Sequence, residues 1–310
     1  MKICFFGVGG VGGYFGTIIT DKFKDQHDIY FVVRGSQKSA ICTNGLTLKK
    51  AGGEQIINVF PTQCTDNIDD LPVCDIVFLS VKSYDLANAA KSINKISNDK
   101  TIILPLLNGV DIYDRIRKHL FTGKVLRSCV YIGTHIESPG VIFQKGGSCN
   151  LFIGNDLRFP DFYPESLLLL LQNSNIDFKW DENIEIAIWS KYMFIAAFGL
   201  VTATYEKTFG EILDDPELSQ ITKSIMHEID QIAKKINISL STDIVETSFL
   251  KGKLFPYETK TSFQRDVEKK GKINEIDIYG GTLIHYSKQY DIPIPNIKNT
   301  FERFMIKTGQ

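Results

Sequence analysis

The fold of this chain follows from the stretch Lys2-Ile3-Cys4-Phe5-Phe6-Gly7-Val8-Gly9-Gly10-Val11-Gly12-Gly13, which places G-x-G-x-x-G directly after a short apolar run. A strand, this glycine pattern and a helix, in that order, are typical of a dinucleotide-binding turn. Gly7 allows the tight turn, Gly9 lets the backbone approach a pyrophosphate, and Gly12 lets the helix pack closely on the strand. The N–H groups and the positive dipole end of the helix then face the phosphates. A glycine-rich turn that binds no ligand is the alternative.

Length and charge narrow the classes of protein. At about 150 residues per domain, 310 residues predict two domains. The 35 Lys and Arg residues nearly balance the 36 Asp and Glu residues, so no basic surface for nucleic acid or lipid is expected. The longest apolar runs, 167–171 and 193–201, fall short of the roughly 18 residues that span a bilayer. No signal-peptide pattern precedes the first strand, and we expect a cytoplasmic protein.

Six cysteines are scattered through the first half of the chain, without a C-x-x-C pair. Such spacing favours buried free thiols over a disulfide framework or a zinc site. The cysteines are Cys4, Cys42, Cys64, Cys74, Cys129 and Cys149. We therefore expect no metal.

The first half alternates apolar strand patterns with helical patterns, which predicts a doubly wound parallel sheet of the Rossmann type. The expected strands are 3–6, 29–33, 76–81 and 102–106, with helices from about residues 11 and 86. Beyond residue 125, strands separated by Ser138-Pro139-Gly140 and by Gly146-Gly147 predict antiparallel pairing. These strands are 125–132, 141–144 and 151–153. We assign residues 1–181 to an α/β cofactor-binding domain.

Strand patterns disappear from residue 182 onward, so residues 182–310 are expected to form a mainly α-helical substrate and catalytic domain. Helical spacing covers 184–204, 217–236, 242–250 and 273–290. Pro293 and Pro295 precede a last short helix.

The end of the second predicted strand selects the cofactor. Arg34 stands where an NAD-binding domain carries Asp or Glu for the ribose 2′-hydroxyl. A guanidinium suits a 2′-phosphate and would lack a counter-charge with NAD, so NADPH is favoured. A solvated charge at the strand end is the alternative, and Lys38 is a second, weaker candidate for the same pocket. The glycine-turn residues expected to bind the cofactor are Gly7, Val8, Gly9, Gly10, Val11 and Gly12.

Motifs along nearly the whole chain together resemble the ketopantoate reductase (2-dehydropantoate 2-reductase) family. They are residues 7–12, Val33-Arg34, Leu79-Ser80-Val81-Lys82-Ser83, Leu107-Asn108-Gly109-Val110, Ile188-Trp189-Ser190-Lys191, Thr261-Ser262-Phe263-Gln264-Arg265-Asp266 and Asn274-Glu275-Ile276-Asp277. The resemblance implies an NADPH-dependent oxidoreductase that reduces a small-molecule 2-keto acid to a 2-hydroxy acid, in pantothenate biosynthesis. A homodimer is compatible with it.

Lys191 is the expected catalytic residue. It follows Trp189 on an otherwise apolar helix, so we expect its ammonium in a partly dry cleft between the domains. There it could polarise a ketone and donate a proton, with a pKa lowered by desolvation. The alternative is a lysine that extends from the helix surface into solvent.

The resemblance gives roles to five further residues. It implies that Asn108 contacts both the nicotinamide ribose and the substrate, that Lys82 lies near the cofactor, and that Ser262 binds substrate. Glu275 would help to position both cofactor and substrate, and the backbone of Ile136 would contact the cofactor. Taken singly, Asn108-Gly109 is also a common turn dipeptide.

Three positions depart from the family pattern. Asparagines are usual four and eight residues after the lysine, on the same helical face, but this chain has Ile195 and Gly199. A third asparagine is replaced by Phe209. Lost amides remove hydrogen bonds worth about 1 kcal/mol each. Either other groups hold ketopantoate, or the substrate is another 2-keto acid with a bulkier apolar tail. A non-catalytic NADPH-binding regulator and a different hydroxyacid dehydrogenase of the same plan are the remaining alternatives.

Overall fold

The chain folds as two units that differ slightly from the expected division. The computed structural model describes residues 1–51, 56–145, 149–269 and 273–309. Unit 1 comprises Met1–Leu107 and Ile112–Ile184, and unit 2 comprises Asn108–Asp111 and Glu185–Gln310. The sequence placed the boundary between residues 181 and 182 and assigned Asn108–Asp111 to the first domain. In the structure this short segment folds with the second unit, because its contacts lie there.

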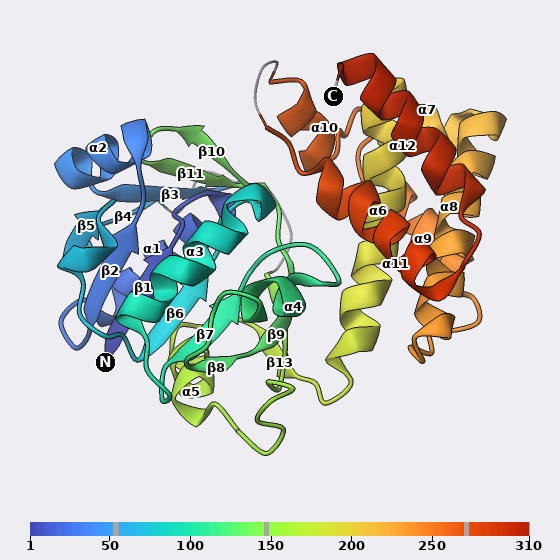
Figure 1. Cartoon of the computed structure of the whole chain (residues 1–310). Helices are drawn as coiled ribbons and strands as arrows, with labels where there is room; N and C mark the ends of the chain where they lie inside the picture. Colours follow the sequence, from blue (N-terminus) through green and yellow to red (C-terminus); the bar gives the residue numbers. More distant parts are fainter. Residues whose placement is uncertain (52–55, 146–148, 270–272, 310) are drawn as a thin grey trace. The chain divides into compact units, whose positions relative to one another are not determined.

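A six-stranded sheet with all neighbouring strands parallel organises unit 1, in the order β5-β2-β1-β6-β7-β8 (Figure 1). Its strands are β1 (Lys2–Phe6), β2 (Asp28–Val32), β5 (Gln63–Thr65), β6 (Ile76–Leu79), β7 (Ile102–Pro105) and β8 (Lys124–Val125). Phe5 on β1 pairs in register with Phe31 on β2 and with Phe78 on β6. The rings of Phe5 and Phe78 stack at 4.7 Å, so apolar side chains run across the sheet centre.

Helix α1 (Gly10–Phe23) lies between this sheet and a second one, and small residues allow the close packing on both sides. A Cβ at Gly16 would lie 3.2 Å from the ring of Phe31, and a Cβ at Gly13 would lie 2.6 Å from Ile142 of the second sheet. The second sheet has the order β10-β11-β3-β4, and a third has β13-β12-β9. Their strands are β3 (Leu46–Lys50), β4 (Ile56–Val59), β9 (Arg127–Tyr131), β10 (Thr134–Ser138), β11 (Val141–Gln144), β12 (Asn150–Gly154) and β13 (Phe178–Trp180).

The remaining helices of unit 1 complete the doubly wound arrangement predicted from the alternating pattern. They are α2 (Gly35–Asn44), α3 (Leu86–Ile93), α4 (Ile112–Arg117) and α5 (Glu165–Asn173), with 3₁₀ turns η1 (Ile68–Asp70), η2 (Ser83–Asp85) and η3 (Asn94–Ile96). The predicted antiparallel pairing holds for β10 with β11 and for β9 with β12. Each of these two pairs also has a parallel neighbour that the prediction did not include. β11 pairs in parallel with β3, and β12 pairs in parallel with β13.

In the described residues of unit 2, all regular secondary structure is helical. Its elements are α6 (Ile184–Tyr205), α7 (Phe209–Asp214), α8 (Pro216–Lys235), α9 (Ile244–Leu250), the 3₁₀ turn η4 (Lys251–Leu254), α10 (Ser262–Val267), the π-helix η5 (Asp277–Gly281), α11 (Thr282–Tyr290) and α12 (Pro295–Thr308). The helix expected from residue 273 begins only at residue 276, after Asn274 and Glu275. The expected short last helix has 14 residues.

Helix α6, expected over residues 184–204, is longer than either of the uninterrupted apolar runs of the sequence. It has 22 residues and a mean hydropathy of 1.6, so by length and composition alone it could cross a membrane. Two charged residues, Glu185 and Lys191, interrupt the apolar run without ending the helix. Within the fold, 67% of the apolar stretch is buried, and Trp189 and Tyr192 are each 1% exposed. The helix packs as a core helix of unit 2.

All six cysteines are free thiols, and their burial differs from the prediction at two positions. Cys4, Cys74, Cys129 and Cys149 are buried as expected, whereas Cys42 is exposed and Cys64 is half-buried. Cys42 is exposed because it lies near the end of α2, a surface helix with few buried residues.

Candidate functional site

The turn between β1 and α1 has the geometry that its glycines predict. Gly7 has φ +97°, and a Cβ there would lie 2.6 Å from the carbonyl oxygen of Ser80. A Cβ at Gly12 would collide with the carbonyl oxygen of Gly7 and with Ser80 Oγ. By contrast, a Cβ at Gly9 would meet no atom within 4 Å, so open space adjoins this part of the backbone. Two glycines thus permit close packing, and the third borders room for a ligand.

The N-terminus of α1 is suited to a diphosphate. Gly9 is the N-cap, no side chain caps the helix, and the first turn carries no acidic residue. The first intrahelical bond joins the Gly13 N–H to the Gly9 carbonyl oxygen at 2.8 Å. The N–H groups of Gly10, Val11 and Gly12 therefore precede that bond, at the positive end of the helix dipole. These residues fit the pyrophosphate of a dinucleotide.

Two polar side chains that sequence reasoning missed hold this turn in place. Ser80 Oγ donates to the carbonyl oxygen of Gly7 at 2.6 Å. Gln37, 9% exposed, donates through Nε2 to the Val8 carbonyl oxygen at 3.1 Å and accepts from the Gly140 N–H at 2.9 Å. Ser80 could have been found as a polar residue directly after the buried strand β6, at the carboxyl edge of the sheet. Gln37 gave no local signal.

Arg34 has a partner that the sequence argument did not foresee. It is the N-cap residue of α2, and its guanidinium forms an ion pair with the carboxylate of Asp85 in the 3₁₀ turn η2. The argument that Arg34 would lack a counter-charge without a 2′-phosphate is therefore wrong. Lys82 is the N-cap residue of the same 3₁₀ turn, so Arg34 and Lys82 both lie at starts of elements that follow sheet strands.

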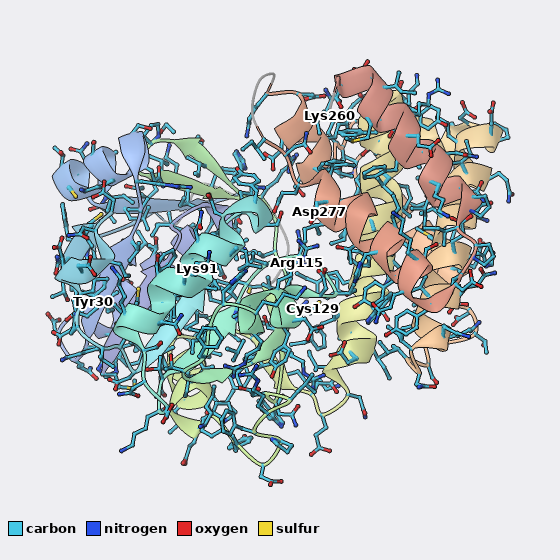
Figure 2. The ribbon with its side chains drawn as sticks, viewed as in Figure 1. Tyr30, Lys91, Arg115, Cys129, Lys260 and Asp277 are labelled. Carbon is cyan, nitrogen blue, oxygen red and sulfur yellow. The ribbon has the colours of Figure 1, made fainter. Side chains whose placement is uncertain are left out.

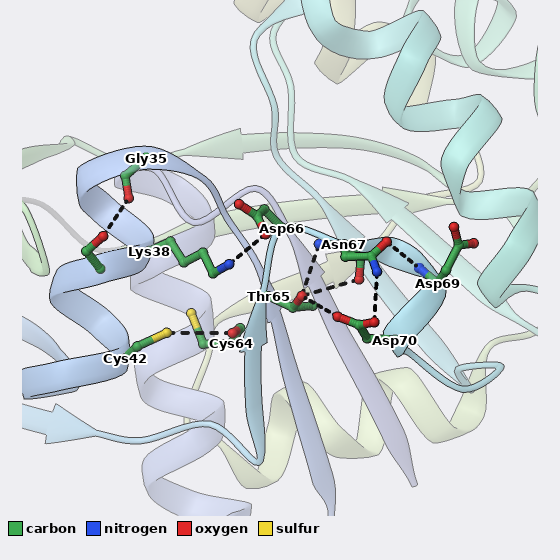
Figure 3. A network of polar contacts seen from close by, with 10 residues as sticks. Gly35, Lys38, Cys42, Cys64, Thr65, Asp66, Asn67, Asp69 and Asp70 are labelled. Carbon is green, nitrogen blue, oxygen red and sulfur yellow. Dashed lines mark hydrogen bonds and ion pairs between the residues drawn. The ribbon is translucent and has the colours of Figure 1, made fainter.

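Lys38, the weaker cofactor candidate, is also paired. Its Nζ donates to Asp66 Oδ1 at 2.6 Å, within a group of polar contacts between α2 and the segment after β5 (Figure 3). This hydrogen bond raises the pKa of Lys38 and lowers that of Asp66. Lys38 is thus part of a surface ion pair.

The strand β10 runs beside the glycine turn. A Cβ at Gly10 would lie 3.0 Å from the carbonyl oxygen of Thr134, the first residue of β10. Ile136 follows on the same strand, pairs in register with Ile142 and is 45% exposed. Its expected backbone contact with the cofactor stays a prediction.

In unit 2 the structure brings together two predicted site residues. Lys191, on α6, donates from Nζ to Oδ1 of Asn108 at 2.6 Å, and the bond is partly buried. Asn108 follows β7 after Leu106 and Leu107, both buried, and precedes Gly109 with φ +135°. Asn108 therefore lies in an irregular segment, where it is the partner of the lysine. The short distance is that of a charge-assisted hydrogen bond.

The segment that carries Asn108 has a second attachment. Thr282 Oγ1 donates to Asp111 Oδ2 at 3.3 Å and lies 3.2 Å from the carbonyl oxygen of Asp277. Asp277, labelled in Figure 2, begins a π-helix that continues into α11. Glu275 lies just before it, and its carbonyl oxygen accepts from the Ile278 N–H at 2.9 Å. Single π-turns inside helices are frequent at functional sites.

Ser262 is the exposed first residue of α10. The preceding Thr261 caps this helix by accepting from the Gln264 N–H at 3.1 Å. Thr261 Oγ1 also lies 2.8 Å from Thr202 Oγ1 on α6, which fixes the start of α10 against the helix that carries Lys191. The substrate-binding role of Ser262 and the positioning role of Glu275 stay predictions.

Apolar and aromatic groups surround the three positions that depart from the family pattern. A Cβ at Gly199 would lie 2.7 Å from the ring of Tyr279, which stacks on Phe263 at 4.4 Å. Phe209 is 4% exposed and stacks on Phe255 at 5.0 Å. Ile195 is half-buried, one turn after Lys191. These positions therefore hold an aliphatic side chain, a glycine beside a ring and a packed ring.

Comparisons with curated proteins find relatives of nearly equal length. An uncharacterized oxidoreductase, YkpB, of Bacillus subtilis is 24% identical over 301 residues, which cover 97% of each chain. A 2-dehydropantoate 2-reductase of Aquifex aeolicus is 25% identical over 317 residues, covering 100% of this chain and 97% of the relative.

Solved structures share the fold at lower identity. A PanE/ApbA family ketopantoate reductase from Ralstonia eutropha superimposes with a TM-score of 0.88 at 21% identity, over 100% of both chains. A D-mandelate dehydrogenase with NADH and anilino(oxo)acetate gives 0.86 at 18% identity, over 100% of this chain and 99% of that one. At these identities the likeness shows the fold alone.

Two sequence models of one family match the two halves of the chain. The model described as "Ketopantoate reductase PanE/ApbA" matches residues 3–156, and "Ketopantoate reductase PanE/ApbA C terminal" matches residues 183–305. Because the two matches together cover most of the sequence, the chain belongs to the ketopantoate reductase family of oxidoreductases.

Proposed function

We propose that this protein is an NADPH-dependent reductase that converts a 2-keto acid to the corresponding 2-hydroxy acid. The observation that carries the proposal is the 2.6 Å hydrogen bond from Lys191 to Asn108. The bond fixes the position of a cationic acid, and the reduction of a ketone is assisted by a proton donor near its oxygen. NADPH, when bound, supplies the hydride that reduces the carbonyl carbon.

Lys191 acts as the general acid. A lysine ammonium has three N–H donors, and the bond to Asn108 orients one of them. Another donates to the ketone oxygen, polarises the carbonyl and passes its proton as the alkoxide forms. One hydride and one proton are added, so the ketone becomes a secondary alcohol and the lysine is left neutral until solvent reprotonates it.

The cofactor assignment rests on unit 1. The uncapped N-terminus of α1 and the open space beside Gly9 fit a diphosphate, and Arg34 fits a 2′-phosphate. Ser80 and Gln37 hold the turn in the shape that such binding needs. The family match adds support for a nicotinamide cofactor.

Two kinds of substrate are proposed. We propose 2-dehydropantoate first, which would place the enzyme in cytoplasmic pantothenate biosynthesis. The alternative is a 2-keto acid with an apolar or aromatic side chain, because the Tyr279 ring packs against Gly199 where the family pattern has an asparagine. The fold shared with a D-mandelate dehydrogenase is compatible with this alternative.

The test is a panel of keto acids. Purified protein is mixed with NADPH and with 2-dehydropantoate, phenylglyoxylate or straight-chain 2-keto acids, and NADPH oxidation is followed by absorbance. We expect turnover with at least one of them, and the ranking of kcat/KM separates the two substrate options. Absence of turnover with the whole panel would refute the enzymatic proposal. Retained NADPH binding in that case would favour a non-catalytic regulator.

A further inference from the structure

An ion pair links two turns at the carboxyl edge of the parallel sheet in unit 1. Arg34 follows β2, and Asp85 lies in the 3₁₀ turn that follows β6. Strands β2 and β6 flank β1, which leads into the glycine turn. The pair therefore lies at the edge of the sheet where a doubly wound domain binds its dinucleotide.

The geometry of the pair leaves the arginine open to a second anion. The bond joins Nη2 of Arg34 to Oδ2 of Asp85. The side chain of Arg34 is 74% exposed, whereas that of Asp85 is 28% exposed. Asp85 is the N-cap residue of α3 but makes no side-chain capping bond, and its carboxylate accepts a hydrogen bond from Arg34.

The two partners recognise different cofactors. In dinucleotide-binding domains an acidic side chain at the end of the second strand accepts a hydrogen bond from the ribose 2′-hydroxyl of NADH. Asp85 comes from the turn after β6, and its ion pair with Arg34 brings its carboxylate to that strand end. A guanidinium binds the 2′-phosphate of NADPH. The Asp85 carboxylate also offsets the charge of Arg34 and would lie close to a 2′-phosphate, which it repels.

Lys38 does not compensate for this carboxylate. It is the basic residue of α2, the helix that Arg34 caps, and its ammonium is bound to Asp66. A 2′-phosphate at Arg34 therefore meets a neutral ion pair and gains no help from Lys38.

We propose that Asp85 is a specificity-determining residue that weakens the preference for NADPH, so that the protein binds NADPH and NADH with affinities within about tenfold of each other. The inference rests on the proposed function, because it takes the glycine turn of unit 1 as the cofactor site. It assigns to this chain a dual cofactor use that Arg34 alone does not predict.

The experiment measures the Kd of NADPH and of NADH by cofactor fluorescence for the wild type and for Asp85→Asn. The amide keeps the size of the side chain and an acceptor for the 2′-hydroxyl but removes the negative charge. We expect the ratio of the NADH Kd to the NADPH Kd to rise about fivefold to tenfold, the scale for one unit charge near a phosphate in a water-exposed setting. The rise shrinks at high salt because exposed charges are screened.

The matched control is Glu246→Gln. Glu246 pairs with Lys223 at 2.8 Å in unit 2, its side chain is 55% exposed, and its substitution changes the net charge by the same amount. We expect its Kd ratio to equal that of the wild type. Near-ultraviolet circular dichroism and thermal melting of both variants show that they are folded.

The outcomes separate this inference from the proposed function. If the wild type binds NADPH but Asp85→Asn leaves the ratio within twofold, the Asp85 inference is refuted and the cofactor proposal stands. A fall in the ratio would also refute it, because Asp85 would then hold Arg34 in place for the phosphate. If the wild type binds neither cofactor, the cofactor proposal is refuted and the inference with it.

Discussion

Replacing Lys191 with alanine tests the central step of the proposed reaction. The substitution removes the ammonium and its 2.6 Å bond to Asn108 and shortens a half-buried side chain on α6. Lys191 is not among the fully buried core residues, whereas its neighbours Trp189 and Tyr192 are 1% exposed. We therefore expect the fold to remain and the chemistry to fail.

The magnitude follows from the two things that are lost. A general acid contributes about 100-fold to 10,000-fold in rate, or about 2.7–5.5 kcal/mol of the activation barrier. A hydrogen bond to a charged group contributes about 1.5–3 kcal/mol. The increase in the activation barrier expected for Asn108→Ala should not exceed this value. We therefore expect kcat to fall at least about 100-fold in Lys191→Ala, and less in Asn108→Ala because the ammonium is retained.

The assay is NADPH oxidation with the best keto acid of the panel, together with the Kd of NADPH. Lys288→Ala is the matched control, because Lys288 is an exposed lysine on α11 of the same unit. We expect the control to keep wild-type kcat and Lys191→Ala to keep the NADPH Kd. A kcat for Lys191→Ala within about tenfold of the wild type would refute the assignment of Lys191 as the acid.

Three further substitutions have defined outcomes. Arg34→Asp should weaken NADPH binding much more than NADH binding, and equal losses for both cofactors would show that Arg34 does not bind the 2′-phosphate. Gly12→Ala places a Cβ against the Gly7 carbonyl oxygen. It should lower the free energy of unfolding by about 1–3 kcal/mol and weaken NADPH binding at least about tenfold. Unchanged urea unfolding and unchanged binding would contradict the close packing. Asp156 is fully buried, forms an ion pair with Arg117 and accepts from the Val125 N–H at 2.8 Å. Asp156→Ala should therefore lower the free energy of unfolding, measured by urea titration, by about 3–5 kcal/mol. A loss under about 1 kcal/mol would contradict this network.

The sequence predicted those elements whose signal is local. The glycine spacing identified the turn from β1 into α1, and the run Ile76–Leu79 is buried at every position, as a central parallel strand should be. The strand β3 was missed because it ends in Lys49 and Lys50. It pairs with the nearby β4 on one side and with β11 on the other, where Leu48 lies beside Ile142, and no short-range pattern encodes that second, distant partner.

The same limit applies to the candidate site. Arg34 and Lys191 could be selected from their own surroundings, but their partners lie far along the chain. Asp85 is 51 residues from Arg34, and Asn108 is 83 residues from Lys191. The missing partner led to a wrong step, since the cofactor argument treated Arg34 as a cation without a counter-charge. Charge arguments from sequence alone therefore fail when the counter-ion comes from another turn of the sheet.

The departures from the family pattern at Gly199 and Phe209 are coupled through packing. The Tyr279 ring lies where a side chain at residue 199 would extend, and the adjacent Phe198 contacts Phe209 with ring centroids 4.8 Å apart. An asparagine at residue 199 would therefore collide with a buried ring that is itself stacked on Phe263. The space beside Gly199 is occupied by a ring from the π-helix η5, so a side chain at residue 199 would require Tyr279 to move. This packing is the reason that we propose a 2-keto acid with an apolar or aromatic side chain as the second substrate option.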